Sequence, residues 1–271
     1  MKKAELYYFN SAELLECPLW DEKRNLIWMI EIRKNRIFAV SPEDHSCKTY
    51  TMPSLVGWIA LRDDGTLYAA LKDGIYIFDP DSVRLEFIAH PEPDMRFRYN
   101  DGHIDPEGRI LVGTKGDSET MEGQGGLYQC RGKEWRKLIH GTTTANGMGF
   151  SPDLSTFYFI DTPSKNIYAY SYDHATGDVS DERIFATLTD GGMPDGMCVF
   201  PDGRICVAEW NGGKAAIFSP DGSLDELIML PVTNVTSCCL ANDRLFITTA
   251  KHKEKYEPTA GGLFTVKLLN A

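Results

Sequence analysis

One short turn element recurs along the whole chain and constrains its fold more than any other feature. The best copies combine Pro, Asp or Glu with Gly, and the degenerate copies keep Asn or Asp, which are the residues that tight hairpins require. The spacing is roughly 40–50 residues, the period typical of four-stranded propeller blades. Six copies are present, at residues 21–25, 64–68, 106–110, 151–155, 201–205 and 241–244.

Short runs of aromatic and β-branched residues lie between these turns, as at 25–30, 66–71 and 156–160, and are typical of strands. A second hairpin turn follows within the repeats, for example at 79–82 and 219–222. Two hairpins per repeat make a four-stranded antiparallel sheet, and no window shows the long 3.6-residue periodicity of a capped helix. The chain is therefore predicted to be all-β, a six-bladed β-propeller of four-stranded antiparallel blades.

Closure of the ring matters because a propeller must hide the edges of its strands. Residues 4–9 form a strand-like run before the first turn, and the last repeat ends with the run 261–266. We expect the N-terminal run to become the outermost strand of the C-terminal blade. No Ser-, Pro- or Gly-rich linker interrupts the series, so residues 1–271 are predicted to form a single domain.

Charge and cysteine content argue against several classes of function. Lys and Arg number 28 against 39 Asp and Glu, and the net charge of −11 disfavours electrostatic binding of nucleic acid or of an anionic membrane. No apolar run has the length of a membrane span or the pattern of a signal peptide. The 7 cysteines include no CxxC motif and no Cys/His cluster, so we expect reduced thiols and a cytoplasmic protein.

Four short segments each place a carboxylate or carboxamide side chain close to Gly or Pro. The polar residues are Glu16, Asn100, Asn146 and Asp195, and each precedes a copy of the repeated turn by a similar distance. One position of the repeat, at the start of an inner strand, therefore carries an oxygen donor in four of six blades. Asn-Gly and Asp-Gly are also common turn pairs, but ordinary turns need not share a position in the repeat.

Inner strands of a propeller begin around a common axis, so these four side chains are predicted to converge in a central pocket. Carboxylate and amide oxygens are hard ligands, which suit Ca²⁺, Mg²⁺ or Mn²⁺ better than a sulfur-rich zinc centre would. The neutral amides would leave positions open for water and substrate, which indicates catalysis. Arg98 lies two residues from Asn100, hence on the same strand face, and is either a substrate contact or part of a surface ion pair.

Six short motifs follow one another over essentially the full chain. They are Glu-Cys-Pro-Leu-Trp at 16–20, Arg-Tyr-Asn-Asp-Gly at 98–102, Pro-Asp-Gly-Met-Cys at 194–198, Trp-Asn-Gly-Gly at 210–213, Thr-Ser-Cys-Cys at 236–239 and Ala-Gly-Gly-Leu-Phe at 260–264. Together they resemble the motifs of the regucalcin (senescence marker protein), gluconolactonase and luciferin-regenerating-enzyme family. Each motif is short, but their joint occurrence in this order is specific.

The resemblance implies a propeller with one divalent cation in its central channel that hydrolyses sugar lactones to aldonic acids. It implies that Glu16, Asn146 and Asp195 are the metal ligands, that Arg98 and Asn100 contact the substrate, and that Asp195 also serves as general base. Calcium is the expected cation, with Mg²⁺, Mn²⁺ or Zn²⁺ as alternatives. The expected partner is a small sugar lactone, not nucleic acid or a membrane, and the expected state is a monomer or weak dimer.

Other functions stay open at this point. A phosphotriesterase-type hydrolase could use a similar oxygen-ligated metal, and a calcium-binding propeller without enzymatic activity is a third possibility. Arg98 next to Asn100 favours an enzyme. Glucono-, galactono-, xylono- and arabinonolactone all remain candidate substrates, because relatives carry sugar-binding acidic residues where this chain has the stretch 113–119, and residues 121–126 are a candidate lid.

Overall fold

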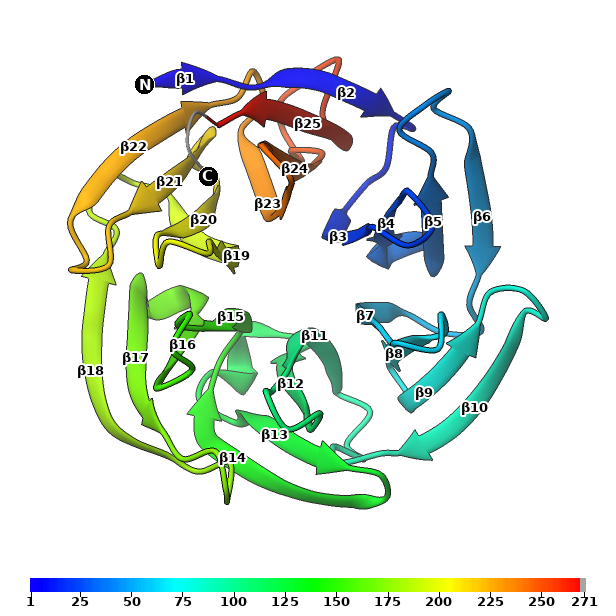
Figure 1. Ribbon diagram of the computed structural model, residues 1–271, viewed down its shortest axis with the longest axis vertical. Helices are drawn as coiled ribbons and strands as arrows, with labels where there is room; N and C mark the ends of the chain where they lie inside the picture. Colours follow the sequence, from blue (N-terminus) through cyan, green and yellow to red (C-terminus); the bar gives the residue numbers. More distant parts are fainter. Residues whose placement is uncertain (269–271) are drawn as a thin grey trace.

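Six antiparallel sheets surround a central axis in the computed structural model, which describes residues 1–268 (Figure 1). Each sheet is one blade, with one strand nearest the axis and the others arranged outward to the rim. The predicted six-bladed all-β propeller is thus confirmed. Within residues 1–268 the only helices are three single 3-10 turns, η1 (Ile32–Lys34), η2 (Glu119–Met121) and η3 (Thr162–Ser164). None of them is long or apolar enough to cross a membrane.

The first three blades each use four consecutive strands, ordered from the axis to the rim. Blade 1 contains β3 (Leu15–Asp21), β4 (Leu26–Glu31), β5 (Arg36–Val40) and β6 (Cys47–Thr51). Blade 2 contains β7 (Val56–Leu61), β8 (Leu67–Leu71), β9 (Gly74–Asp79) and β10 (Arg84–Ala89). Blade 3 contains β11 (Phe97–Ile104), β12 (Ile110–Gly116), β13 (Gly125–Arg131) and β14 (Glu134–Thr142).

The last three blades follow the same order. Blade 4 contains β15 (Ala145–Phe150), β16 (Thr156–Asp161), β17 (Asn166–Tyr172) and β18 (Val179–Thr187). Blade 5 contains β19 (Met193–Val199), β20 (Ile205–Trp210), β21 (Lys214–Phe218) and β22 (Leu224–Met229). Blade 6 contains only three strands from the C-terminal part of the chain, β23 (Asn234–Ala241), β24 (Arg244–Ala250) and β25 (Gly262–Lys267).

The N-terminal residues supply the missing strand and close the ring. Strand β2 (Glu5–Phe9) pairs antiparallel with β25 and becomes the rim strand of blade 6, as predicted. Strand β1 (Lys2–Lys3) runs parallel to β22, so the same segment also extends blade 5. In Figure 1 the N-terminal ribbon lies across the outside of both blades. The start of the chain therefore joins two blades that are separated from it by more than 200 residues of sequence.

Apolar side chains from facing blades fill the space between the sheets. Large residues such as Trp28, Phe78, Phe157 and Phe264 are almost completely buried there. Small residues are required where inner strands meet near the axis. At Gly57 of β7, an added Cβ would lie 1.9 Å from the carbonyl oxygen of Tyr99, which no side chain allows. The ring of inner strands is therefore packed closely enough to hold side chains at its centre in fixed positions.

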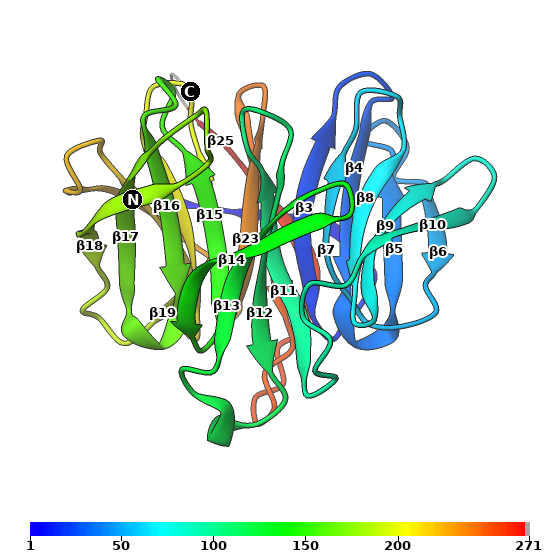
Figure 2. The ribbon, with the colours of Figure 1, turned by 90° about the horizontal axis from the view of Figure 1, so that it is seen from below.

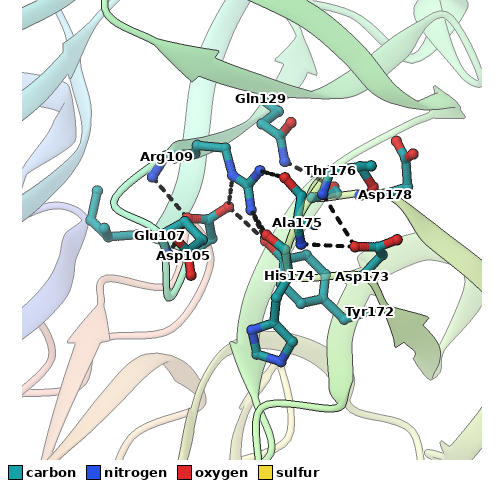
Figure 3. A network of polar contacts seen from close by, with 12 residues as sticks. Asp105, Glu107, Arg109, Gln129, Tyr172, Asp173, His174, Ala175, Thr176 and Asp178 are labelled. Atoms are coloured by element: carbon teal, nitrogen blue, oxygen red, sulfur yellow. Dashed lines mark hydrogen bonds and ion pairs between the residues drawn. The ribbon is translucent and has the colours of Figure 1, made fainter.

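A buried ion pair joins blade 3 to blade 4 on the face that carries the β11–β12 hairpin (Figure 3). The Asp105 carboxylate accepts hydrogen bonds from Arg109 Nε, from the amide of Arg109 at 2.8 Å and from the Tyr172 hydroxyl at 2.6 Å. Arg109 Nη2 donates to the carbonyl oxygen of His174 at 2.7 Å, and Nη1 donates to that of Ala175 at 3.3 Å. The Asp105 side chain is fully shielded from water, so this network holds the hairpin of one blade against the next.

Candidate active site

Every inner strand carries a β-bulge at the same level of the ring. The pairing with the second strand of the blade is interrupted after Glu16, Val56, Tyr99, Ala145, Pro194 and Val235. Bulges bend a strand and redirect its side chains. Asn100, Asn146 and Asp195 are each the first residue inside their bulge, whereas Glu16 is the last paired residue before its own. The repeat position found in the sequence is thus a ring of bulges around the axis.

The bulges of the two remaining inner strands, β7 and β23, add no side-chain oxygen that is free to bind a cation. Gly57 occupies the bulge of β7 and has no side chain to offer. Thr236 occupies the bulge of β23, and its hydroxyl already donates to the carbonyl oxygen of Leu15 at 2.6 Å and contacts Thr248 Oγ1 at 2.9 Å. The oxygen-rich positions are therefore restricted to blades 1, 3, 4 and 5.

The two amide side chains are oriented by hydrogen bonds from their nitrogen atoms. Asn100 Nδ2 donates to the carbonyl oxygen of Ala145 at 2.8 Å. Asn146 Nδ2 donates to the Thr162 hydroxyl at 2.9 Å, and that hydroxyl donates in turn to the carbonyl oxygen of Pro194 at 2.8 Å. Within residues 1–268 neither amide oxygen accepts a hydrogen bond, so both remain available to a ligand. Thr162, which the sequence did not single out, connects Asn146 to the strand that carries Asp195.

Close approach of β15 and β19 brings Asn146 and Asp195 together. A Cβ on Gly147 would lie 2.7 Å from both the carbonyl oxygen of Asp195 and the amide nitrogen of Met197. The side chain of Asn146 is near enough to Asp195 to lower the pKa of this carboxyl group. Gly147 is therefore the residue that allows the two predicted ligands to become neighbours.

Three carboxyl groups share the interior of the ring. Burial raises the pKa of Glu16 well above its usual range, and the charges of Asp195 and Asp101 raise it further. Burial raises the pKa of Asp195 to about 7, although Lys115 and Arg98 act in the opposite direction. Burial likewise raises the pKa of Asp101 to about 7, and one of its oxygens accepts a hydrogen bond from the amide of Gly102 at 2.7 Å.

These groups fit a bound divalent cation. No ion pair within 4.0 Å balances any of the three carboxylates in the described part of the chain, so their buried negative charge lacks a bonded counter-charge. Among the side chains that the structure describes, no cluster of three His, Cys, Asp or Glu is arranged to hold a metal. A cation would therefore need the amide oxygens of Asn100 and Asn146 in addition to carboxylates, and this mixed oxygen set is of the type that calcium accepts.

Two cationic side chains lie beside the carboxylates. Arg98 Nη1 donates to the carbonyl oxygen of Tyr99 at 3.1 Å. Burial lowers the pKa of Arg98, against the opposing effect of the Glu16 and Asp195 charges. Lys115 was not predicted as a site residue, yet it is the cation with the largest effect on the pKa of Asp195. It lies directly opposite Arg98 in the pairing of β11 with β12.

Two further ring side chains and the candidate lid lie apart from this group. Trp58 is buried between the blades. His103 contacts the carbonyl oxygen of Ile104 at 2.7 Å through Nδ1, and burial lowers its pKa. Residues 121–124 lie in the connection between β12 and β13, which contains η2 and projects from the lower edge of the ring in Figure 2, and residues 125–126 begin β13.

A cavity of about 510 Å³ opens at the opposite end of the axis, among the hairpins that follow the inner strands. It is lined by Cys17, Trp58, Asp101, Cys198 and Cys238 among others, and by none of Glu16, Asn146 and Asp195. Cys198 Sγ and Cys238 Sγ are 3.5 Å apart at its wall as free thiols, which agrees with the expectation of reduced cysteines. Asp101 lines this cavity, and its charge also raises the pKa of Glu16.

Comparison with known proteins identifies similar sequences and structures. Residues 14–251 match the SMP-30/Gluconolactonase/LRE-like region. YvrE of Bacillus subtilis (strain 168), a candidate sugar lactone lactonase, is 33% identical over 95% of this chain and 92% of its own length. The 6-deoxy-6-sulfogluconolactonase of Pseudomonas putida is 29% identical over 93% of this chain and 90% of its own length. The calcium-binding regucalcin structure from Agrobacterium tumefaciens has a TM-score of 0.92 at 24% identity and covers 98% of this chain and 94% of that one.

Proposed function

The chain belongs to the SMP-30/gluconolactonase/luciferin-regenerating-enzyme family, and from this we propose that it is a divalent-cation-dependent lactonase that opens aldonolactones to aldonic acids. One observation carries the proposal. Two carboxylates, the half-buried Glu16 and the buried Asp195, share the axis with the amide oxygens of Asn100 and Asn146, which accept no hydrogen bond from the described residues, and the half-buried guanidinium of Arg98 lies beside them. This is the donor set of a hard cation combined with a group that can bind a polar substrate.

Glu16, Asn146 and Asp195 would hold the cation, with Asn100 close to it or to its water. When bound, the cation would supply Lewis acidity for the lactone carbonyl and for a nucleophilic water. The Agrobacterium regucalcin is described as a calcium-binding protein, which supports calcium as the first candidate. Thr162 fixes the amide of Asn146 so that its oxygen, and not its nitrogen, is presented to the ligand.

The side chains of this chain would perform the remaining steps. Arg98 and Asn100 would orient the lactone by hydrogen bonds to its oxygen atoms, and Arg98 would stabilise negative charge that develops as the ring opens. Asp195 is the candidate general base that takes a proton from the attacking water. The relatives named as lactonases support a lactone as substrate, and glucono-, galactono-, xylono- and arabinonolactone are the candidates.

Acid release in a pH-stat tests the proposal directly. Lactones of five- and six-carbon sugars are supplied to protein treated with chelator and then reloaded with Ca²⁺, Mg²⁺, Mn²⁺ or Zn²⁺. We expect hydrolysis that chelator removes and one of these cations restores. A phosphotriester substrate in the same assay tests the alternative hydrolase, and calcium binding without any turnover would indicate the non-enzymatic alternative.

Cation binding measured by calorimetry tests the ligand set without relying on activity. Glu16→Ala and Asp195→Ala should each lose most of the affinity, because each removes one of two carboxylates. Asp202→Ala is the matched control, since Asp202 is an exposed carboxylate on the hairpin that follows β19. Full cation binding by the Glu16→Ala, Asp195→Ala double variant would refute the assignment.

A further inference from the structure

Two positive side chains face each other across neighbouring strands at the mouth of the site. Arg98 on β11 and Lys115 on β12 are directly opposite in the antiparallel pairing. Side chains at opposite positions of such a pair project from the same face of the sheet, and like charges there are destabilising. Burial lowers the pKa of Lys115, and the charge of Arg98 lowers it further. Because this pair of like charges lowers the stability of the fold, a negatively charged group beside it would compensate it.

The backbone places Lys115 between two blades and next to the predicted ligands. Besides pairing with Arg98, Lys115 forms a bridge with Thr144, two residues before Asn146. The negative charges of Asp195 and Glu16 both raise the pKa of Lys115. Its ammonium group nevertheless makes no hydrogen bond and no ion pair within 4.0 Å with any side chain that the structure describes. Lys115 is thus a largely enclosed cation at the site without a bonded partner.

Two further acidic side chains near this pair have other partners. Asp117, two residues after Lys115, forms an ion pair with Lys72 at 3.0 Å, although its charge also raises the pKa of Arg98. Asp101 accepts a hydrogen bond from Gly102 and lines the cavity at the other end of the axis. Arg33, an exposed residue of η1, adds a third positive charge, which lowers the pKa of both Arg98 and Lys115. The mouth of the site is therefore cationic in a chain of net charge −11.

Charge balance shows what remains for a ligand to neutralise. The three carboxylates Glu16, Asp195 and Asp101 carry three negative charges, whereas Arg98, Lys115 and the one divalent cation that the proposed function requires carry four positive charges. One net positive charge is left over, and neither Arg98 nor Lys115 forms an ion pair within 4.0 Å among the described side chains. A neutral lactone would leave this charge uncompensated when it covers the two side chains and excludes water, which is costly.

We propose that the site takes a lactone that carries an additional anionic group, and that Lys115 together with Arg98 binds this group. The inference rests on the proposed function, because it concerns the same site. The chemistry is that of a carboxylate, phosphate or sulfonate on the substrate, each of which accepts charge-assisted hydrogen bonds from ammonium and guanidinium groups. Lys115 is the residue that determines this specificity.

Matched pairs of ligands test the proposal. D-Glucono-1,5-lactone and 6-phospho-D-glucono-1,5-lactone differ only in the phosphate, and D-glucaro-1,4-lactone supplies a carboxylate instead. We expect kcat/KM for at least one anionic lactone to exceed that of the neutral lactone at least tenfold, and the advantage to shrink as salt is raised. Lys115→Met should reduce the ratio of anionic to neutral kcat/KM by roughly tenfold to a hundredfold, the effect of one charge-assisted contact. Lys137→Met is the control, since Lys137 lies on rim strand β14 with its ammonium group over the Tyr128 ring.

A binding measurement separates this proposal from the lactonase assignment. Calorimetry compares gluconate with 6-phosphogluconate, with and without calcium, in the parent protein and in Lys115→Met. Tighter binding of 6-phosphogluconate that Lys115→Met abolishes would support the inference even if no lactone is hydrolysed. Equal binding of the two acids, together with equal hydrolysis of neutral and anionic lactones, would overturn it and leave the proposed function standing. Increased calcium affinity in Lys115→Met without any change in the ligand ratio would also overturn it, because Lys115 would then act only on the carboxylates.

Discussion

Replacement of Asp105 by Ala should destabilise the propeller more than any exposed charge change does. The substitution removes the partner of a buried guanidinium, since the side chains of Asp105 and Arg109 are 0% and 6% exposed. It also removes the acceptor for the Tyr172 hydroxyl and for the amides of Glu107 and Arg109. Breaking a buried pair from one side typically costs about 3–5 kcal/mol, because an uncompensated charge remains in the interior.

The expected shift in melting temperature follows from the size of the chain. An unfolding entropy of about 2.1 cal/mol/K per residue gives roughly 0.57 kcal/mol/K for 271 residues, so the loss of about 3–5 kcal/mol lowers Tm by about 5–9 °C. Differential scanning calorimetry measures this shift. Asp202→Ala is the matched control, because Asp202 occupies the corresponding hairpin of blade 5, where its pair with Arg204 is exposed and should contribute less than about 1 kcal/mol.

A double variant distinguishes loss of the pair from loss of packing. Asp105→Ala combined with Arg109→Met removes both charges and replaces the guanidinium with an apolar chain. We expect it to melt above Asp105→Ala alone, because no charge is left buried without a partner. Two results would contradict this reasoning. In the first, Asp105→Ala lowers Tm no more than Asp202→Ala does. In the second, the Tm loss of the double variant equals the sum of the losses of Asp105→Ala and Arg109→Met, which would mean that the two side chains do not interact.

Three further predictions concern the site and its surroundings. Arg98→Ala should lower kcat/KM for the best lactone by roughly tenfold to a hundredfold with cation content unchanged in metal analysis, and Arg98→Lys should recover only part of the loss. Gly147→Ala should weaken calcium binding in calorimetry, because its Cβ would meet backbone atoms of β19 at 2.7 Å, whereas Gly149→Ala, which meets a methyl group of Val199 at 2.9 Å, should change binding little. Burial raises the pKa of Glu209 to about 7. Between pH 4.5, the usual pKa of this carboxyl group, and about 7, Glu209 is protonated in the folded protein but ionised in the unfolded chain. The contribution of Glu209 to the free energy of unfolding in urea therefore increases as pH falls from about 8 to 5, and Glu209→Gln should remove that part of the pH dependence. Unchanged kcat/KM for Arg98→Ala, unchanged calcium affinity for Gly147→Ala, or an undiminished pH dependence for Glu209→Gln would each contradict its prediction.

The fold could be predicted because the turns are chemically constrained. The copies at 64–68, 106–110 and 201–205 contain Gly65, Gly108 and Gly203, which all have positive φ, so the sequence marks the ends of the inner strands directly. Closure by residues 4–9 could also be anticipated, since a strand-like run without a partner stood before the first repeat. Local chemistry and the spacing of the repeats were sufficient for both.

The site could be predicted only at the level of the repeat position. The bulges shift the pairing within each inner strand, so counting residues along β11 and β12 does not reveal that Arg98 faces Lys115. Thr162 is 16 residues from Asn146 and belongs to η3, and no local motif links the two. The sequence identified the residues at the axis, whereas the residues that orient them or add charge depend on contacts between strands.

Ring closure by the N-terminal strand also sets an order of events during synthesis. Blades 1 to 4 use continuous stretches of chain, so each can fold soon after it leaves the ribosome. Blade 6 cannot be completed until β25 is made, because Glu5 pairs with Thr265. Pairing across so many residues carries a large loop-closure cost and is slow. Until that final step, the edges of β2 and β25 are both unpaired, and two nascent chains that meet at this stage could exchange their N-terminal strands.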